Sequence, residues 1–394
     1  MKYKNLYLKN GKEESLKRFH PWIFSGAIHH YDDSIGEGEV VRVCNLKGEF
    51  LCVGHYQIGS IAVRVLSFQE EQIDLDFWIK KLHMAYELRR AIGVVDSPLN
   101  NTYRLVHGEG DSLPGLVIDI YAHTAVMQAH SVGFHLCRKE IAEALTVVMG
   151  NTVSNIYYKS ETTLPFKAEL EAENGFLLGE STDNIAMEYG LKFHVDWLKG
   201  QKTGFFVDQR ENRRLLEHYS KGRSVLNMFC YTGGFSFYAM RGEAQLVHSV
   251  DSSAKAIELT NQNVELNFPG DSRHEAFAED AFKYLDRMGD QYDLIILDPP
   301  AFAKHRDALR NALQGYRKLN AKAFEKIRPG GILFTFSCSQ VVTKENFRTA
   351  VFTAAALSGR NVRILHQLTQ PADHPVNIYH PEGEYLKGLV LYVE

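Results

Sequence analysis

Short apolar runs alternate with amphipathic stretches along the second half of the chain. The runs have the length of buried strands, and the stretches between them space their apolar residues as one face of a helix does. This alternation predicts a doubly wound parallel α/β sheet that binds ligands at the carboxyl ends of its strands. The expected strands are 224–229, 246–250, 274–277, 292–297 and 332–336, and the expected helices are 235–240, 254–265, 281–288 and 314–327.

The first 75 residues have a different pattern, in which short β-branched and aromatic runs are separated by glycine turns. This pattern predicts a small β domain over residues 1–75. Ahead of the runs, residues 17–26 mix cations with aromatic rings around Trp22. Such a mixture is typical of RNA-binding surfaces, and it is equally typical of a barrel lid with a buried tryptophan. The runs that predict strands are 40–45, 50–55 and 61–66.

A middle α+β domain is predicted over residues 76–183. It begins with an amphipathic helix at 74–91, and strand-like runs and a second helix follow. A predicted hairpin at 184–195 then opens a C-terminal α/β domain over 184–394. The strands expected in the middle domain are 104–106, 116–120, 124–128 and 155–158, and its second helix is expected at 135–149.

Polar residues follow the predicted strands of the C-terminal domain at the edge where ligands bind. A dinucleotide site is expected to carry G-x-G-x-x-G in the first turn, but residues 230–235 read CYTGGF. S-adenosylmethionine has no phosphates, so this departure favours it as the ligand. The predicted cofactor-binding residues at this edge are Phe229, Tyr231, Thr232, Gly233, Gly234, Asp251, Asp280 and Asp298.

Two of these acids have a specific expected role. Asp251 ends the second strand, where a carboxylate can hold ribose hydroxyls. Asp280 is placed to accept a hydrogen bond from an adenine amino group. Asp is also a good helix N-cap, and the two roles are compatible.

Composition defines the expected compartment and partners. The net charge of −4 over 394 residues means that any nucleic-acid binding must use local patches. No apolar run approaches the roughly 18 residues of a membrane span, and the N-terminus lacks the apolar stretch of a signal peptide. The five cysteines are scattered, without zinc-like pairs. We therefore expect a cytoplasmic protein with no membrane partner and no metal.

Several motifs occur together in the second half of the chain. They are LNMFCYTGGFSF, SVDSS, ILDPPAFAK and FTFSCS, followed by DHP at 373–375 and YLKGL at 385–389. With residues 202–210, they resemble the bacterial ribosomal RNA large-subunit cytosine-5 methyltransferase I family over most of the chain. The resemblance implies an N-terminal PUA domain, a middle domain and a Rossmann-like domain that uses S-adenosylmethionine to methylate large-subunit ribosomal RNA.

The resemblance and the chemistry of cytosine give several residues a predicted role. Because cytosine C5 is a poor nucleophile, a thiolate must first add to C6 and move electron density onto C5. Cys338 is the predicted nucleophile, although a lone cysteine after an apolar strand is also typical of simple packing. Asp298 is predicted to hydrogen-bond cytosine N3 and the exocyclic amine. Gln209, in the motif of residues 202–210, is a predicted cofactor contact, and Pro299, Pro300 and Phe302 are predicted substrate contacts. Lys304 and Arg210 lie in two cationic stretches that are predicted to meet RNA phosphates, although such residues are equally typical of solvated helix faces. Trp22 is the predicted RNA contact of the β domain.

The residue that removes the C5 proton is left unassigned. Related two-cysteine RNA methyltransferases carry a second cysteine after the motif proline, whereas here Ala301 follows Pro300. Cys230 lies inside the cofactor turn, where packing is its expected role.

Two alternative functions remain open. A methyltransferase that acts on a guanine nitrogen also carries D-P-P-x-F, but it needs no thiol. An RNA-binding module with a degenerate cofactor pocket is a second alternative, and the intact set of glycines and acids speaks against it. The sequence leaves open the target nucleotide, the choice between naked RNA and an assembled particle, and the oligomeric state, a homodimer included.

Overall fold

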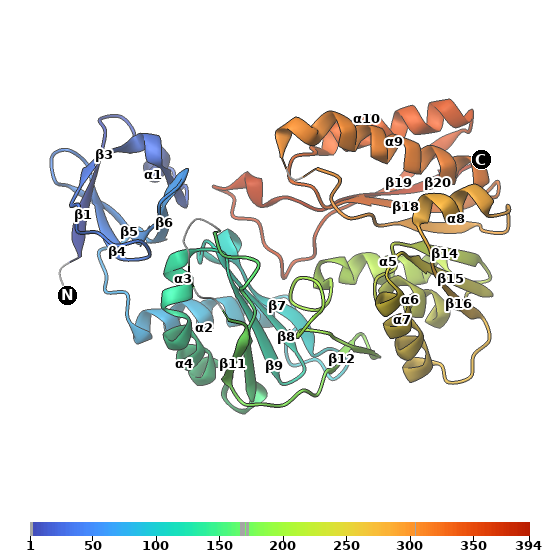
Figure 1. The fold of residues 1–394 in the computed structure, drawn as a ribbon, viewed down its shortest axis with the longest axis horizontal. Helices are drawn as coiled ribbons and strands as arrows, with labels where there is room; N and C mark the ends of the chain where they lie inside the picture. Colours follow the sequence, from blue (N-terminus) through green and yellow to red (C-terminus); the bar gives the residue numbers. More distant parts are fainter. Residues whose placement is uncertain (1–2, 166–169, 171–172, 304) are drawn as a thin grey trace. The chain divides into compact units, whose positions relative to one another are not determined.

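The chain folds into two compact units, which Figure 1 shows as a ribbon of the computed structural model. The structure describes residues 3–165, 170, 173–303 and 305–394. The first unit contains Met1–Gly190, Val195–Val207 and Ala372–Gly383, and the second contains Leu191–His194, Asp208–Pro371 and Glu384–Glu394. A short segment near the C-terminus therefore belongs to the N-terminal unit.

A mixed six-stranded sheet forms the N-terminal part of the first unit. Its elements are β1 (Lys4–Leu8), α1 (Glu14–Lys17), β2 (Trp22–Phe24), β3 (Ile28–Tyr31), β4 (Val40–Cys44), β5 (Phe50–Tyr56) and β6 (Ile61–Ser67). The strand order is β2-β6-β5-β4-β1-β3, and β1 runs parallel to β4. Val41 and Val43 alternate with outer residues along β4 and are fully buried, which is the pattern of a strand with one face on a core. The three predicted strands are confirmed, and β1, β2 and β3 add to them.

A five-stranded sheet with the order β11-β10-β9-β8-β7 forms the rest of this unit. The elements of this part are α2 (Leu75–Ala91), β7 (Thr102–His107), β8 (Leu116–Tyr121), β9 (Thr124–Ala129), α3 (Val132–Leu136), α4 (Arg138–Met149), β10 (Asn155–Tyr158) and β11 (Gly175–Leu178). β12 (Ile185–Glu188) lies outside the five-stranded sheet. α2 starts where predicted, because the Asp74 side chain accepts a hydrogen bond from Phe77 N at 3.1 Å. The prediction of one continuous helix at 135–149 is wrong. Cys137, with φ −90° and ψ 10°, interrupts this segment and divides it into α3 and α4.

The second unit is built on a seven-stranded sheet with the order β16-β15-β14-β17-β18-β20-β19. Its strands are β13 (Leu191–His194), which lies outside that sheet, β14 (Ser224–Met228), β15 (Leu246–Asp251), β16 (His274–Ala278), β17 (Leu294–Leu297), β18 (Gly331–Ser337), β19 (Val362–Leu368) and β20 (Lys387–Val393). β14 to β18 are mutually parallel, as predicted, and the strand order reverses between β14 and β17. Ligands bind at such a reversal in open α/β sheets.

Helices cover both faces of this sheet. They are α5 (Arg210–Tyr219), α6 (Gly234–Arg241), α7 (Ala254–Asn267), α8 (Ala281–Arg287), α9 (Leu309–Lys326) and α10 (Lys344–Ser358). One apolar core lies under α8, α9 and α10, and a separate one lies under α5 and α6. The predicted helices are confirmed, and the pattern analysis does not predict α5, α10, β19 or β20.

Candidate active site at the carboxyl ends of the parallel strands

The turn between β14 and α6 has an unusual backbone. Phe229, Tyr231 and Gly233 all have positive φ, at 58°, 48° and 82°. A Cβ atom on Gly233 would lie 2.7 Å from Cγ2 of Thr260, so glycine is required by both the backbone and the space around it. Left-handed conformations in bulky residues are uncommon and concentrate at functional sites.

Asp251, at the end of β15, holds this turn in place. Its Oδ2 accepts a hydrogen bond from Tyr231 N at 3.0 Å, and its Oδ1 accepts one from Ser253 N at 2.9 Å. From α7, Thr260 Oγ1 donates to Tyr231 O and Asn263 Nδ2 donates to Thr232 O, both at 2.9 Å. The structure thus brings the predicted acid and the predicted turn into direct contact.

One polar atom of the turn fits a ligand. Thr232 Oγ1 is buried and has no hydrogen-bond partner among the described residues. Buried hydroxyl groups are normally satisfied, so this atom is suited to a polar group that enters the turn.

Cys230 behaves as a packed side chain within the same turn. Its thiol is buried and lies 3.8 Å from Thr260 Oγ1. Burial raises the pKa of this thiol, which keeps it protonated and unreactive.

Asp280 caps the N-terminus of α8. Its Oδ1 accepts hydrogen bonds from Phe282 N at 3.0 Å and from Lys283 N at 3.1 Å. The residue is exposed at the end of β16, so its capping role leaves room for the predicted contact with adenine.

Asp298 directly follows β17 and is held by buried amides. Gln209 Nε2 donates to Asp298 Oδ2 at 3.1 Å, and Asn212 Nδ2 donates to Gln209 Oε1 at 2.6 Å. Burial, followed by the charge of Asp208, raises the pKa of Asp298 to about 7, while the Gln209 bond and the charge of Arg213 oppose the rise. The carboxyl group is therefore close to half protonated at neutral pH.

The start of α5 supports Asp298 and is less exposed than its charges indicate. Arg210 is 1% exposed, and its Nε donates to Glu211 Oε1 at 3.1 Å. Asp208, just before it, accepts a hydrogen bond from the hydroxyl of Tyr385 at 2.7 Å. The sequence analysis misses Asp208, Asn212 and Tyr385 as members of this group. The signal in the sequence that could have identified this group is a set of polar residues, at 208, 209 and 212, with the spacing of one helix face.

Cys338 lies between two anchored serines just after β18. Ser337 Oγ donates to the hydroxyl of Tyr316 at 2.9 Å, and Ser339 Oγ donates to Ala303 O at 2.7 Å. Both serines are buried, whereas Cys338 is partly exposed. Because β17 and β18 are parallel neighbours, Cys338 and Asp298 emerge at the same edge of the sheet.

The predicted substrate residues after Asp298 take different positions. Pro299 is buried, Pro300 is exposed, and the Phe302 ring packs on Tyr316 with centroids 4.7 Å apart. Lys304 lies outside the described residues.

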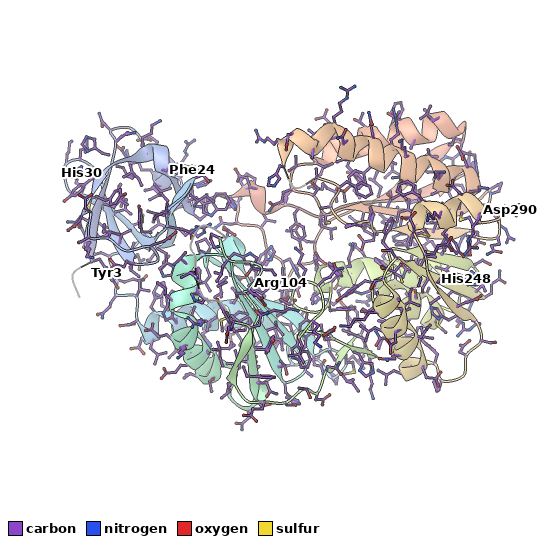
Figure 2. The ribbon with its side chains drawn as sticks, in the orientation of Figure 1. Tyr3, Phe24, His30, Arg104, His248 and Asp290 are labelled. Atoms are coloured by element: carbon purple, nitrogen blue, oxygen red, sulfur yellow. The ribbon has the colours of Figure 1, made fainter. Side chains whose placement is uncertain are left out.

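The DHP motif belongs to the first unit. Asp373 is fully buried; its Oδ2 accepts a hydrogen bond from Arg104 N at 3.0 Å, and its carbonyl accepts one from Arg89 Nη2 at 2.7 Å. Arg104, labelled in Figure 2, also pairs with Asp119 at 2.8 Å. The motif therefore anchors the segment Ala372–Gly383.

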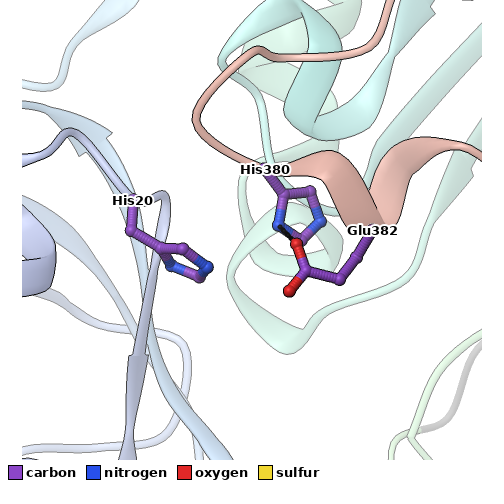
Figure 3. A group of neighbouring side chains, drawn as sticks. All are labelled: His20, His380 and Glu382. Carbon is purple, nitrogen blue, oxygen red and sulfur yellow. Dashed lines mark ion pairs between the residues drawn. The ribbon is translucent and has the colours of Figure 1, made fainter.

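Trp22 also lies in the first unit, where its Nε1 donates to Glu109 Oε1 at 2.9 Å and its ring lies 4.2 Å from that of His380. Figure 3 shows His380 beside His20 and Glu382, the one group of metal-type side chains found among the described residues. His20 Nδ1 lies 3.1 Å from Trp22 N and 3.2 Å from Trp22 O, and His380 Nδ1 lies 3.1 Å from Glu382 Oε2. These contacts within the chain account for the group, and we assign no metal to it.

No helix in the described part of the chain is long and apolar enough to span a membrane.

Comparison with known proteins gives two domain matches. Residues 161–377 match the S-adenosylmethionine-dependent methyltransferases, and residues 6–68 match a PUA-like domain.

Full-length relatives define the family. A ribosomal RNA large subunit methyltransferase I from Aeromonas hydrophila is 40% identical, over 98% of this chain and 98% of its own. The chain belongs to the ribosomal RNA large subunit methyltransferase I family. The family member from Tolumonas auensis is likewise 40% identical over 98% of both chains. A solved structure from Streptococcus mutans, described as a candidate SAM-dependent methyltransferase, has a TM-score of 0.83 at 24% identity and covers 99% of this chain and 100% of its own, which shows the shared fold.

Membership of this methyltransferase family confirms the predicted fold, the PUA-like domain and S-adenosylmethionine as the cofactor. The residues suited to hold that cofactor are those of the β14–α6 turn, with its buried Thr232 hydroxyl, together with Asp251 and Asp280. When bound, S-adenosylmethionine supplies the methyl group.

Proposed function

We propose that this protein methylates C5 of a cytosine in large-subunit ribosomal RNA through a covalent bond between Cys338 and C6. The observation that carries the proposal is a partly exposed cysteine, flanked by two buried and hydrogen-bonded serines, on the same sheet edge as Asp298. Methylation of a guanine nitrogen needs no thiol, so that alternative gives Cys338 no chemical role.

The Cys338 thiolate adds to C6, and the electron pair of the C5–C6 bond moves toward C5 and N3. The half-protonated carboxyl group of Asp298 donates a hydrogen bond to N3, where negative charge develops. After C5 has gained the methyl group, the C5 proton passes to the base left unassigned above, and the electron pair of the C5–H bond re-forms the C5–C6 double bond. The carbon–sulfur bond breaks in the same step and returns the thiolate to Cys338.

The names of the relatives and the PUA-like domain support large-subunit ribosomal RNA as the substrate. Ribosomal RNA is made and assembled in the bacterial cytoplasm, so we propose this location for the protein. Trp22 and Phe24, which is 51% exposed and labelled in Figure 2, are the rings that we propose for contact with RNA in the first unit.

A trapping experiment tests the mechanism. RNA that carries 5-fluorocytosine has no C5 proton to lose, so the thioether should persist after methyl transfer. We expect the wild-type protein with S-adenosylmethionine to form a denaturation-resistant adduct, the Cys338→Ala protein to form none, and the Cys230→Ala control to form it. Methyl transfer by Cys338→Ala near the wild-type rate would overturn the mechanism. Nucleoside mass spectrometry of ribosomal RNA from a deletion strain then distinguishes 5-methylcytidine from a methylated guanine.

A further inference from the structure

Lys387 is a buried lysine beside the candidate nucleophile. It begins β20 and lies directly opposite Ser337 in the antiparallel β18–β20 pair, one residue before Cys338. Its side chain is buried, with only 6% of the residue exposed. Nζ donates hydrogen bonds to the carbonyl oxygens of Ser339 and Val342, the latter at 2.7 Å.

These two bonds act on the loop that carries the thiol. Ser339 follows Cys338 directly, and Val342 lies three residues further on. The two hydrogen bonds from Lys387 Nζ therefore hold the loop that follows Cys338 around the ammonium group. On the opposite side, Ser339 is tied to Ala303 O at 2.7 Å. The backbone on the C-terminal side of Cys338 is therefore fixed from two directions.

The ammonium group of Lys387 is held by backbone carbonyls, and it takes part in no ion pair among the described residues. A buried ammonium group is costly unless an opposite charge lies nearby. Burial lowers its pKa to about 8, the charge of Cys338 raises it, and the charges of Lys344 and Glu384 act in opposite directions to each other. Glu384 is already paired with Lys344 at 2.7 Å, so Cys338 is the acid with the larger effect on the ammonium group.

We propose that Lys387 is a positioning residue that keeps Cys338 as a thiolate and holds its loop in place. The inference rests on the proposed role of Cys338. The proton balance is simple, because a thiol beside a neutral amine and a thiolate beside an ammonium ion contain the same atoms. The ammonium ion stabilises sulfur's charge before addition to C6 and again when sulfur leaves.

The pH dependence of alkylation tests this inference without RNA. Iodoacetamide reacts with the thiolate, and peptide mass spectrometry follows Cys338 separately from the other four cysteines. In the wild-type protein we expect a reaction midpoint below about 8.5, the ordinary value for a thiol. A wild-type midpoint at or above that value would overturn the inference, even if every variant fails to fold.

Two substitutions separate charge from hydrogen bonding. Lys387→Gln keeps N–H donors for the two carbonyls but removes the charge, and we expect the midpoint to rise by about one pH unit and the rate at pH 7 to fall roughly tenfold. Lys387→Arg keeps the charge and should restore most of the rate. Lys221→Met is the matched control, because Lys221 is exposed, pairs with Glu243 at 2.8 Å and has no effect on the pKa of Lys387.

The outcomes separate this inference from the proposed function. If Cys338 in the folded Lys387→Gln protein is alkylated with the same pH midpoint as in the wild type, Lys387 only holds the loop in place and the inference fails. Cys338 can then still be the nucleophile. If the midpoint depends on Lys387 but Cys338→Ala still methylates RNA, the proposed function fails and the inference stands.

Discussion

Gln209 Nε2 donates a hydrogen bond to Asp298 Oδ2 at 3.1 Å, and so links the start of α5 to the end of β17. This bond lowers the pKa of Asp298, whereas burial and the charge of Asp208 raise it more strongly. The result is a carboxyl group with a pKa of about 7, which suits the role we propose for Asp298 and lowers the stability of the folded protein at neutral pH.

The first prediction concerns the loss of stability that follows from the raised pKa of Asp298. Asp298 keeps its proton up to about pH 7 in the folded protein, but loses it near pH 3.8 when unfolded. Between these values the folded state loses stability as pH rises. Asp298→Asn should therefore increase the free energy of unfolding by roughly 2–4 kcal/mol at pH 8.5, with the gain nearly absent at pH 4. Urea titrations at both pH values measure it, and Asp290→Asn controls for loss of an exposed carboxylate. An equal gain at both pH values would contradict the prediction.

The second prediction concerns the cofactor. Asp251→Ala should weaken S-adenosylmethionine binding by about 1–3 kcal/mol, because the ribose hydroxyls lose a charged acceptor and the turn loses its bond to Tyr231 N. Isothermal calorimetry measures the affinity. Glu258→Ala, which removes an exposed carboxylate from α7, should bind as the wild type does. Equal affinities in the two variants would refute the role of Asp251.

The third prediction concerns Gly233. Gly233→Ala should lower the free energy of unfolding by about 2–4 kcal/mol, because the left-handed backbone and the clash with Thr260 both add to the cost. Gly359 has a similar φ of 68° with nothing within 4 Å of an added Cβ, so Gly359→Ala should cost only about 1 kcal/mol. Adding Thr260→Ser, which removes Cγ2, should recover part of the loss at Gly233. Equal costs at the two glycines would show that the clash relaxes freely.

The fourth prediction concerns RNA. Trp22→Ala should weaken binding of ribosomal RNA fragments by about three- to tenfold, because a base loses its stacking surface, while cofactor affinity stays the same. Trp22→Phe keeps a ring and should bind nearly as well as the wild type. Filter binding measures both variants. Wild-type affinity in the alanine variant would assign Trp22 a packing role against His380.

The sequence predicts the parts of the site that are local in the chain. A parallel strand that ends in an acid or a thiol presents it at the ligand edge, so Asp251, Asp298 and Cys338 are visible from periodicity. The group around Gln209 cannot be predicted in this way, because polar residues are expected on the surface and only the fold brings Gln209 to Asp298 and Tyr385 to Asp208. The role of Lys387 cannot be predicted from the sequence for the same reason, because only the pairing of β18 with β20 brings it opposite Ser337.

β20 follows β19 in the chain, yet it lies between β18 and β19 in the sheet and pairs with both. β19 therefore has no neighbour in the sheet until β20 is in place. During synthesis this edge of the sheet can close only after β20 has left the ribosome, and the buried position of Lys387 forms at that step.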